Sequence, residues 1–324
     1  MSKYKIFVTD KGFQNYDKEV KELSKYDAEL IFASKNDTET FISEGHDADI
    51  VINTFTEVTS EFIERLSNCR MIIRTGIGVN TINVEAATKK GIMVSYVPDY
   101  CRDEVADHST TLALAICRKV AFLNKRVHEG VWNSVEAGYV PRINGKTFGL
   151  LGFGGIAKRV AKRMQAFGMK ILAYDPYLKD EEFEQLNVKR ATTVDDVFRK
   201  ADMISLNLPL TDETYHIINK DSFVKMKKGV FIVNTARGPL INEDDLVEAL
   251  TNGTVCGAGL DVFEVEPLPL ESKLRSFENV ILTPHAAYYS NDSLPELQVK
   301  TFKEVVRVLN NEKPINWFNK KNMI

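Results

Sequence analysis

The chain has 324 residues, of which 44% are hydrophobic and 27% are charged, and its formal net charge is −3. This length favours two domains, and the composition is typical of a globular protein. Basic residues form no long block, which argues against nucleic acid and anionic membranes as partners. We expect a cytoplasmic protein, because the sequence shows neither a signal-peptide pattern nor an apolar run of membrane-spanning length.

The four cysteines, at positions 69, 101, 117 and 256, are dispersed and form no CxxC pair. This spacing argues against both a disulfide framework and a zinc site, and it fits a reducing compartment. We therefore expect no structural metal.

The first hundred residues alternate short apolar runs with helical periodicity. Strands are predicted at 5–9, 48–53, 71–75 and 92–97, with helical patterns between them, for example at 59–67 and 83–90. Continuous apolar strands separated by helices indicate a parallel sheet that is covered on both faces.

A turn at Pro98 and Asp99 ends this first set, and a long helical pattern then runs to about Gly130. The strands predicted after that helix are 148–153, 170–175, 203–209, 230–235, 255–263 and 280–285. The segment from Ser293 to about Asn311 is helical and is expected to pack on the first domain. The sequence therefore predicts an α/β protein with two doubly wound parallel sheets.

A glycine-rich turn joins the strand at 148–153 to a helical pattern. Gly152 permits a tight turn, Gly154 lets the backbone approach a pyrophosphate, and Ala157 is an accepted small residue at the third position. Amides near Gly155 and Ile156 would bind phosphates at the start of the helix. A glycine triple alone is also compatible with a tight connection that binds nothing.

Asp175 strengthens the nucleotide interpretation, because it ends the next predicted strand, where a carboxylate can accept both ribose hydroxyls. The same carboxylate would repel a 2′-phosphate, and the following residues bring no arginine. NAD is therefore expected in preference to NADP.

Residues that could bind a ligand or take part in catalysis lie at the ends of further predicted strands. They are Arg237 in "NTARG", Asp261 and Glu266 in "GLDVFEVEP", and His285 in "TPHAA". Ligands bind at the carboxyl ends of strands in open parallel sheets. Each residue also has a structural alternative. Arg237 could pair with Glu243 or Asp244, and Asp261 could cap a turn. Glu266 could be a solvated loop carboxylate, and His285 could be a structural group with satisfied hydrogen bonds.

Together these motifs resemble those of the D-isomer-specific 2-hydroxyacid dehydrogenase family, in the expected order over nearly the whole chain. The matching segments are "TGIGVN" (75–80), the glycine turn with Asp175, "LNLPLTDET" (206–214), "NTARG" (234–238), "GLDVFEVEP" (259–267) and "TPHAA" (283–287). The segments "VPDYCRDEVADH" (97–108) and "PHAAYYS" (284–290) are most similar to the C-terminal-binding-protein-like branch.

The resemblance implies roles for the strand-end residues. His285 would exchange a proton with the substrate oxygen, and the ordinary pKa of histidine, about 6.5, suits this task. Glu266 would orient the imidazole and favour its protonated form. Arg237 would bind the substrate carboxylate or carbonyl through its fork of donors. The backbone amides of Gly76, Ile77 and Gly78 would complete the carboxylate site.

The resemblance also implies cofactor contacts. Asp261 would accept the nicotinamide carboxamide, while Leu208 and the backbone of Thr235 and Ala236 would line the cofactor channel. Tyr288 would contact the substrate. Hydroxypyruvate or glyoxylate, a phosphoglycerate and a hydrophobic keto acid all remain open as substrates. A phosphorylated substrate would need extra cations, for which Arg74 and Arg102 are candidates.

The family layout implies a flavodoxin-like substrate domain, 1–100 plus 293–324, and an inserted Rossmann NAD-binding domain, 101–292. Trp132 and Tyr139 lie on an extended segment, 127–145, which implies a homodimer; an arm packed on its own domain is the alternative.

The leading functional hypothesis is an NAD-dependent reductase of a 2-keto acid to the D-2-hydroxy acid. An NAD(H)-sensing, partner-binding protein of the C-terminal-binding-protein type is the alternative. The short stretch after the last helix, which resembles no partner-binding tail, favours the enzyme.

Some positions depart from the family pattern. Gly155 stands where a larger polar or basic residue is common, and Asn207 stands where histidine is common. The remaining histidines, at positions 46, 108, 128 and 216, are interpreted as structural or surface groups.

Overall fold

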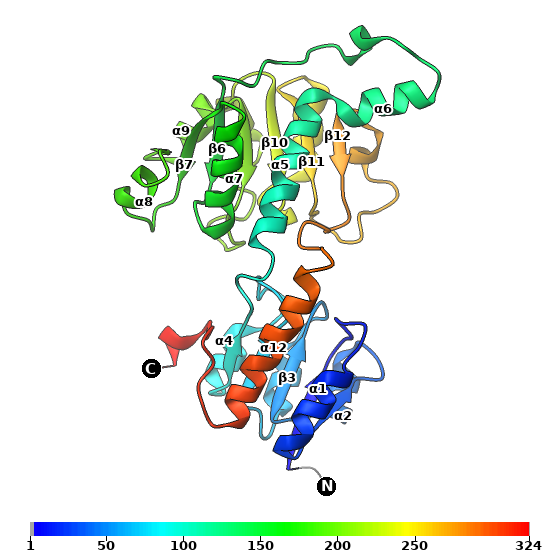
Figure 1. The fold of residues 1–324 in the computed structure, drawn as a ribbon, viewed down its shortest axis with the longest axis vertical. Coiled ribbons are helices and arrows are strands. Elements are labelled where there is room, and N and C mark those ends of the chain that lie inside the picture. Colours follow the sequence, from blue (N-terminus) through cyan, green and yellow to red (C-terminus); the bar gives the residue numbers. More distant parts are fainter. Residues whose placement is uncertain (1–2, 324) are drawn as a thin grey trace. The chain divides into compact units, whose positions relative to one another are not determined.

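The computed structural model describes residues 3–323, which form two compact units (Figure 1). The terminal unit contains the chain up to Tyr100 and the chain from Ser290 onward, and the central unit is Cys101–Tyr289. The chain thus returns to the terminal unit between residues 289 and 290, three residues before the position that the family layout implies. No helix within residues 3–323 is both long enough and apolar enough to cross a membrane.

The terminal unit contains a five-stranded parallel sheet in the order β2-β1-β3-β4-β5, which is the flavodoxin-like order. The strands are β1 (Tyr4–Val8), β2 (Ala28–Phe32), β3 (Ile50–Asn53), β4 (Met71–Arg74) and β5 (Met93–Ser95). The helices are α1 (Asp17–Leu23), η1 (Ser24–Tyr26), α2 (Thr38–Gly45), α3 (Ser60–Arg65), α4 (Val84–Lys89), α12 (Ser293–Leu309) and η5 (Lys320–Asn322).

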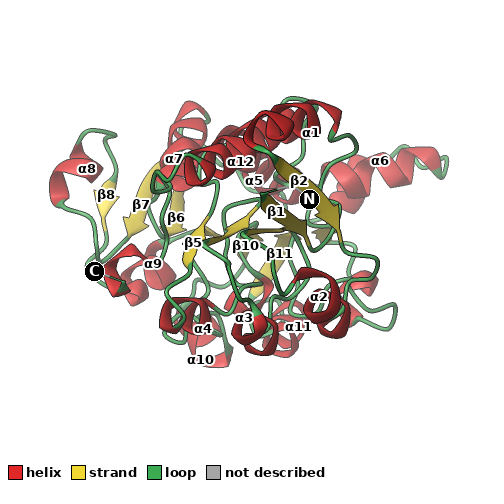
Figure 2. Ribbon diagram, turned by 90° about the horizontal axis from the view of Figure 1, so that it is seen from below, coloured by secondary structure: helices red, strands yellow, loops and turns green. Residues whose placement is uncertain are grey.

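Helices cover both faces of this sheet, with α1 and α12 on one side and α2, α3 and α4 on the other (Figure 2). On the second side Phe7, Phe41 and Phe62 are fully buried, with ring centroids 5.5–6.1 Å apart. Such aromatic contacts add to the free energy gained by burying the apolar area.

The C-terminal segment completes the terminal unit, as the sequence suggests. Arg70 donates to the carbonyl oxygen of Val308 on α12 at 2.9 Å. Asn319, which is 3% exposed, accepts from the Val94 amide at 2.8 Å and donates to the Ile92 carbonyl at 3.0 Å. The last residues therefore satisfy the polar groups of edge strand β5.

The central unit contains a seven-stranded parallel sheet in the order β12-β11-β10-β9-β6-β7-β8. The strand order reverses between β6 and β9, which is the ligand-binding switch point of a Rossmann sheet. The strands are β6 (Thr147–Leu151), β7 (Lys170–Tyr174), β8 (Lys189–Arg190), β9 (Met203–Leu206), β10 (Val230–Asn234), β11 (Val255–Leu260) and β12 (Val280–Leu282).

Its helices are α5 (Arg102–Arg118), α6 (Val120–His128), η2 (Ser134–Ala137), α7 (Gly155–Ala166), α8 (Asp180–Glu184), α9 (Val194–Lys200), α10 (Lys220–Lys225), η3 (Gly238–Leu240), α11 (Glu243–Thr251) and η4 (Lys273–Ser276). Helices α5 and α7 pack side by side, and ion pairs from Arg159 and Arg163 to Asp103 and Asp107 join them. The two-sheet α/β prediction is confirmed.

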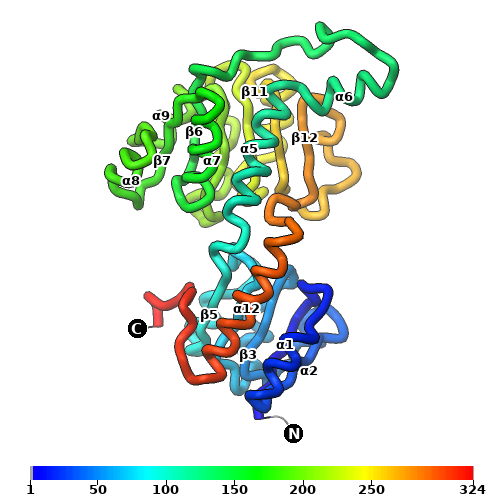
Figure 3. The backbone as a smooth tube through the Cα atoms, viewed as in Figure 1, coloured from blue at the N-terminus to red at the C-terminus, as the bar shows by residue number. Residues whose placement is uncertain are grey.

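The prediction of one helix to about Gly130 is wrong. Lys119 adopts the left-handed conformation, with φ of +57°, and separates α5 from α6. Figure 3 shows that α6 and the following chain extend away from the rest of the central unit before they return to β6. On this arm, residues 120–146, Trp132 is 89% exposed and Tyr139 is 63% exposed.

Candidate active site

The glycine turn lies at the switch point of the central sheet. Gly152 directly follows β6 and has a φ of +86°. A Cβ atom at this position would be 2.5 Å from the carbonyl oxygen of Asn207, which follows β9. Both the conformation and the close approach therefore require glycine.

The next positions of the turn leave room for a ligand at the start of α7. Gly154 is exposed and is the N-cap, and a Cβ atom there would contact nothing within 4 Å. The first amides of a helix have no partner within the helix, so those at Gly155 and Ile156 suit an anion. Ala157 is fully buried against the sheet, which explains why a small residue suffices there.

The carboxylate of Asp175 closes the same turn from the end of β7. Its Oδ2 accepts from the Phe153 amide at 3.0 Å, and its Oδ1 accepts from the Tyr177 amide at 3.0 Å. The side chain is thereby held beside the glycine turn, where the ribose of a dinucleotide is bound in Rossmann sheets.

Three further predicted cofactor contacts follow β9 and β10. Leu208 packs against the core beside Gly152, and the Ala236 amide donates to Asn234 Oδ1 at 3.0 Å. The Thr235 hydroxyl is buried and has no hydrogen-bond partner within residues 3–323. A buried hydroxyl without a partner is costly, so this residue suits a polar ligand such as a dinucleotide.

His285 and Glu266 form a direct pair. The distance between His285 Nδ1 and Glu266 Oε2 is 2.7 Å, and both side chains are about one-third exposed, at 38% and 36%. Because Nδ1 is engaged by the carboxylate, Nε2 is the nitrogen left to face a ligand. His285 also has a φ of +52°, a conformation that is uncommon for a residue with a side chain.

Glu266 is held in its ionised form. Partial burial raises the pKa of its carboxyl group, but the hydrogen bonds with His285 and the Phe263 amide outweigh this effect. The pKa of Glu266 therefore lies below its ordinary value. An ionised partner stabilises a protonated imidazole, as an acid–base histidine requires.

Asp261 anchors the turn that carries His285. This aspartate is 1% exposed, and its Oδ1 accepts from the Thr283 hydroxyl at 2.5 Å and from the Ala286 amide at 2.8 Å. Its Oδ2 accepts from the Ala287 amide at 2.9 Å. Asp261 therefore caps the turn that carries His285, as the structural alternative for this residue predicts.

His108 and Thr283 belong to the same network, although neither is a predicted site residue. The distance between His108 Nε2 and the Thr283 hydroxyl is 2.9 Å, and His108 Nε2 lies 3.5 Å from Asp261 Oδ1. A polar residue on the core-facing side of α5 is the signal that could have indicated this pairing.

Arg237 lies on the loop after β10, next to the loop that carries Glu266. Gly238 is buried, and a Cβ atom there would be 1.9 Å from the carbonyl carbon of Phe263. The positive charge of Arg237 contributes to the lowered pKa of Glu266. The central unit therefore brings Arg237, Glu266 and His285 together, and Tyr288 joins them with its ring 6.2 Å from that of His285.

The predicted carboxylate loop, Gly76, Ile77 and Gly78, follows β4 in the terminal unit. Gly76 has a φ of +150°, and its carbonyl oxygen accepts from the Val97 amide at 2.9 Å. A Cβ atom at Gly76 would be 1.3 Å from a guanidinium nitrogen of Arg74. The arginine thus places positive charge directly over this loop.

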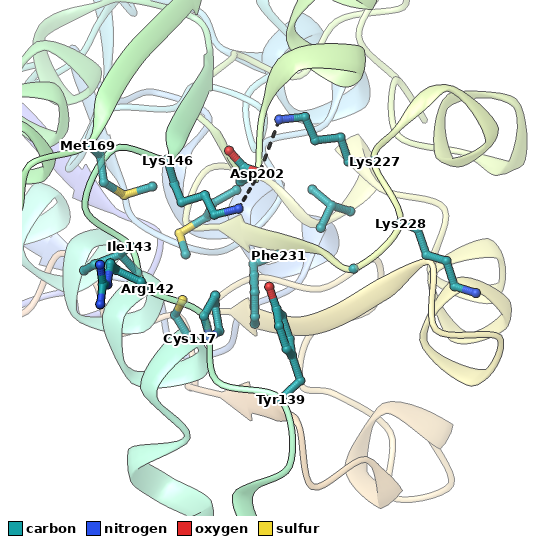
Figure 4. Close-up of a pocket in the computed structure, with 14 residues that line it drawn as sticks. Cys117, Tyr139, Arg142, Ile143, Lys146, Met169, Asp202, Lys227, Lys228 and Phe231 are labelled. Carbon is teal, nitrogen blue, oxygen red and sulfur yellow. Dashed lines mark hydrogen bonds and ion pairs between the residues drawn. The ribbon is translucent and has the colours of Figure 1, made fainter.

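A pocket at the opposite, amino end of the central sheet contains none of the predicted site residues (Figure 4). Asp202, at the start of β9, accepts from Lys227 at 3.2 Å and from the Thr147 amide at 2.8 Å, and it pairs with Lys146. This cluster ties the beginnings of neighbouring strands together, whereas ligands of such sheets bind at the carboxyl ends.

Fold and geometry define a dinucleotide-binding α/β protein with a histidine–glutamate pair, and comparison with known proteins gives the family. The sequence model of the NAD-binding domain of D-isomer-specific 2-hydroxyacid dehydrogenases matches residues 110–287. The chain belongs to the D-isomer-specific 2-hydroxyacid dehydrogenase family, which confirms the resemblance at the level of the family. It is an NAD-dependent oxidoreductase that acts on the CH–OH group.

Relatives named as reductases and dehydrogenases align with most of the chain. The hydroxypyruvate reductase of Thermotoga maritima is 43% identical over 79% of this chain and 84% of its own length. The glyoxylate reductase of Thermofilum pendens is 35% identical over 85% of this chain and 82% of its own length. The D-3-phosphoglycerate dehydrogenase of Methanocaldococcus jannaschii is 38% identical over 86% of this chain, but only 53% of that protein is matched.

Solved structures of related enzymes have the same fold. A glyoxylate reductase from Paecilomyes thermophila superposes with a TM-score of 0.89 at 29% identity, over 99% of this chain and 100% of that chain. The D-lactate dehydrogenase of Aquifex aeolicus, in complex with NAD and lactic acid, superposes with a TM-score of 0.83 at 28% identity, over 95% of this chain and 96% of that chain.

Proposed function

We propose that this protein reduces a short 2-keto acid to the D-2-hydroxy acid, with His285 as the proton donor. The observation that carries the proposal is the 2.7 Å contact between His285 Nδ1 and the ionised Glu266. It leaves Nε2 as the nitrogen that can deliver a proton to a carbonyl oxygen.

The other site residues bind and orient the substrate in this proposal. Arg237 donates to the substrate carboxylate or carbonyl oxygen and polarises the C=O bond. The loop of Gly76, Ile77 and Gly78 binds the carboxylate through its amides, and the terminal unit is the substrate domain. Tyr288 contacts the substrate beside His285.

The residues around the glycine turn suit NADH, which supplies the hydride when it is bound. Gly154, Gly155 and Ile156 offer amides to the phosphates, and Asp175 accepts the ribose hydroxyls. Leu208, Thr235 and Ala236 line the cofactor channel, and Asp261 accepts the carboxamide of the nicotinamide while it holds the His285 turn. Asp175 also favours NAD over NADP by repelling a 2′-phosphate.

Among the candidate substrates, we place hydroxypyruvate and glyoxylate first. The hydroxypyruvate reductase and the glyoxylate reductase described above each align over most of their own length, which supports this order. The next candidates are a hydrophobic keto acid and, as the substrate of the reverse reaction, a phosphoglycerate. We also propose that the protein is a homodimer, whose interface includes the exposed apolar side chains of the arm.

The deciding experiment follows NADH oxidation with hydroxypyruvate, glyoxylate, phenylpyruvate and a phosphorylated keto acid. We expect turnover that His285→Ala lowers by about 10²–10⁴-fold, the typical contribution of acid–base catalysis. NADH binding by this variant should persist, because His285 does not belong to the glycine turn. Tight NADH binding without turnover of any keto acid would instead support the NAD(H)-sensing alternative.

A further inference from the structure

The guanidinium group of Arg102 lies over the glycine turn. A Cβ atom built on Gly155 would be 3.1 Å from Arg102 Nε and 3.3 Å from Cζ. Gly155 does not have a positive φ, so its backbone would accept a side chain. The space that a side chain at position 155 would occupy is thus filled by an arginine from α5.

This position is electrostatically unusual for a cation. Arg102 is the first residue of α5, which has 17 residues, and its side chain lies beside the first residue of α7, which has 12. The amino end of a helix carries partial positive charge, so both helices disfavour a guanidinium group at this point. A bound anion would offset this repulsion, because it attracts both the arginine and the two helix ends.

Other charged side chains near the glycine turn form ion pairs with one another. Asp103, which follows Arg102 in the sequence, directs its carboxylate to Arg159 at 3.0 Å and to Arg163 at 3.1 Å. These contacts outweigh the effect of desolvation and hold the pKa of Asp103 below its ordinary value. Lys158, in the first turn of α7, pairs with Glu182. Among these basic residues, Arg102 is the one that lies against Gly155.

We infer that Arg102 is a cofactor-binding residue whose guanidinium group binds the pyrophosphate of the dinucleotide beside Gly155. The planar fork of an arginine matches two phosphate oxygens, and it remains charged at all relevant pH values. The inference rests on the proposed function, because that proposal puts the dinucleotide on the turn 152–157. It also assigns Arg102 to the cofactor instead of a phosphorylated substrate.

The test compares the dissociation constants of NADH, ADP-ribose and adenosine in wild type, Arg102→Gln and Lys162→Gln. Titration calorimetry measures the first two, and displacement of NADH measures adenosine. Lys162 is an exposed residue of α7, and its substitution removes the same charge away from the turn. Arg102→Gln should weaken NADH and ADP-ribose about tenfold, the value of one charge-assisted hydrogen bond, and leave adenosine unchanged. Lys162→Gln should change none of the three.

A second pair of variants moves the guanidinium group to the other side of the same space. Arg102→Ala should weaken NADH binding, and adding Gly155→Arg to that variant should restore most of the affinity. The inference is overturned if Arg102→Gln and Lys162→Gln bind NADH equally well. Equal losses for adenosine and NADH would also overturn it, because adenosine has no pyrophosphate. A wild-type protein that binds no NADH would instead refute the proposed cofactor site.

Discussion

The backbone of Phe263 lies directly against Gly238, so that a Cβ atom at position 238 would be 1.9 Å from the carbonyl carbon of Phe263. Gly238 follows Arg237, and the Phe263 amide donates to Glu266 Oε1 at 3.0 Å. This contact therefore fixes the loop of Arg237 relative to the loop of Glu266.

Gly238→Ala should disturb both loops together. The added methyl group cannot be placed without moving backbone, and overpacking of this kind costs about 1–3 kcal/mol of the free energy of unfolding. We expect a lower midpoint in urea denaturation and a lower kcat/KM for the best keto acid. Unchanged values of both would show that the loops are not coupled through this contact.

Glu266→Gln should change how stability depends on pH. The pKa of Glu266 is lower in the folded protein than its ordinary value, so its ionised form stabilises the folded state above the unfolded pKa. This contribution is lost as pH falls through the folded pKa. Calorimetry should therefore find a Tm difference between wild type and variant that is largest near neutral pH and shrinks in acid. A difference that does not vary with pH would contradict the assignment.

Thr283→Val should loosen the turn that carries His285. The variant removes the hydroxyl that donates to the buried Asp261, and the loss of such a bond to a charged group costs about 1.5–3 kcal/mol. Denaturation and steady-state kinetics should both show the loss. Thr251→Val is the matched control, because Thr251 is exposed at the end of α11 and its hydroxyl donates to the Val247 carbonyl. Equal effects of the two variants would refute the role of Thr283.

Asp175→Ala should shift cofactor preference. Removal of the carboxylate removes its repulsion of a 2′-phosphate, so the ratio of kcat/KM for NADPH to that for NADH should rise about tenfold or more. Affinity for NADH itself should fall, because the carboxylate also binds the Phe153 amide. If NADPH use does not improve, Asp175 is not the residue that selects NAD.

Val135→Glu should convert a dimer into a monomer. Val135 is 82% exposed on the arm beside the exposed Trp132, and a charge in an apolar interface is costly when it has no partner. Val224→Glu is the matched control, since Val224 is 83% exposed on α10. Sedimentation should give a dimer for wild type and for the control. A monomeric wild type would refute the proposed interface.

The fold was largely predictable, because apolar strands and intervening helices follow simple periodicities. The exceptions have physical reasons. Strand β2 (Ala28–Phe32) was not predicted, because it is an edge strand of mostly half-buried residues. Strand β8 was not predicted, because it has only two residues. The break at Lys119 was not predicted, because glycine is the usual sequence signal for a left-handed residue and lysine gives no such signal.

The grouping of His285, Glu266 and Arg237 was predictable, because each lies at or just after the end of a predicted strand. Contacts between distant segments were not, because nothing in a single sequence indicates which side chains meet. The link from His108 on α5 to Thr283 spans 175 positions. The position of Arg102 beside Gly155 depends on how α5 packs against α7.

The interleaved order of the two units has a consequence for biosynthesis. The central unit is one continuous segment. In the terminal unit, by contrast, Arg70, just before β4, and Val94 of β5 hydrogen-bond with Val308 and Asn319. Domains fold as units while the ribosome extends the chain. The cofactor-binding half can therefore acquire its structure during translation, while the half that is synthesised first must wait for the last residues to emerge.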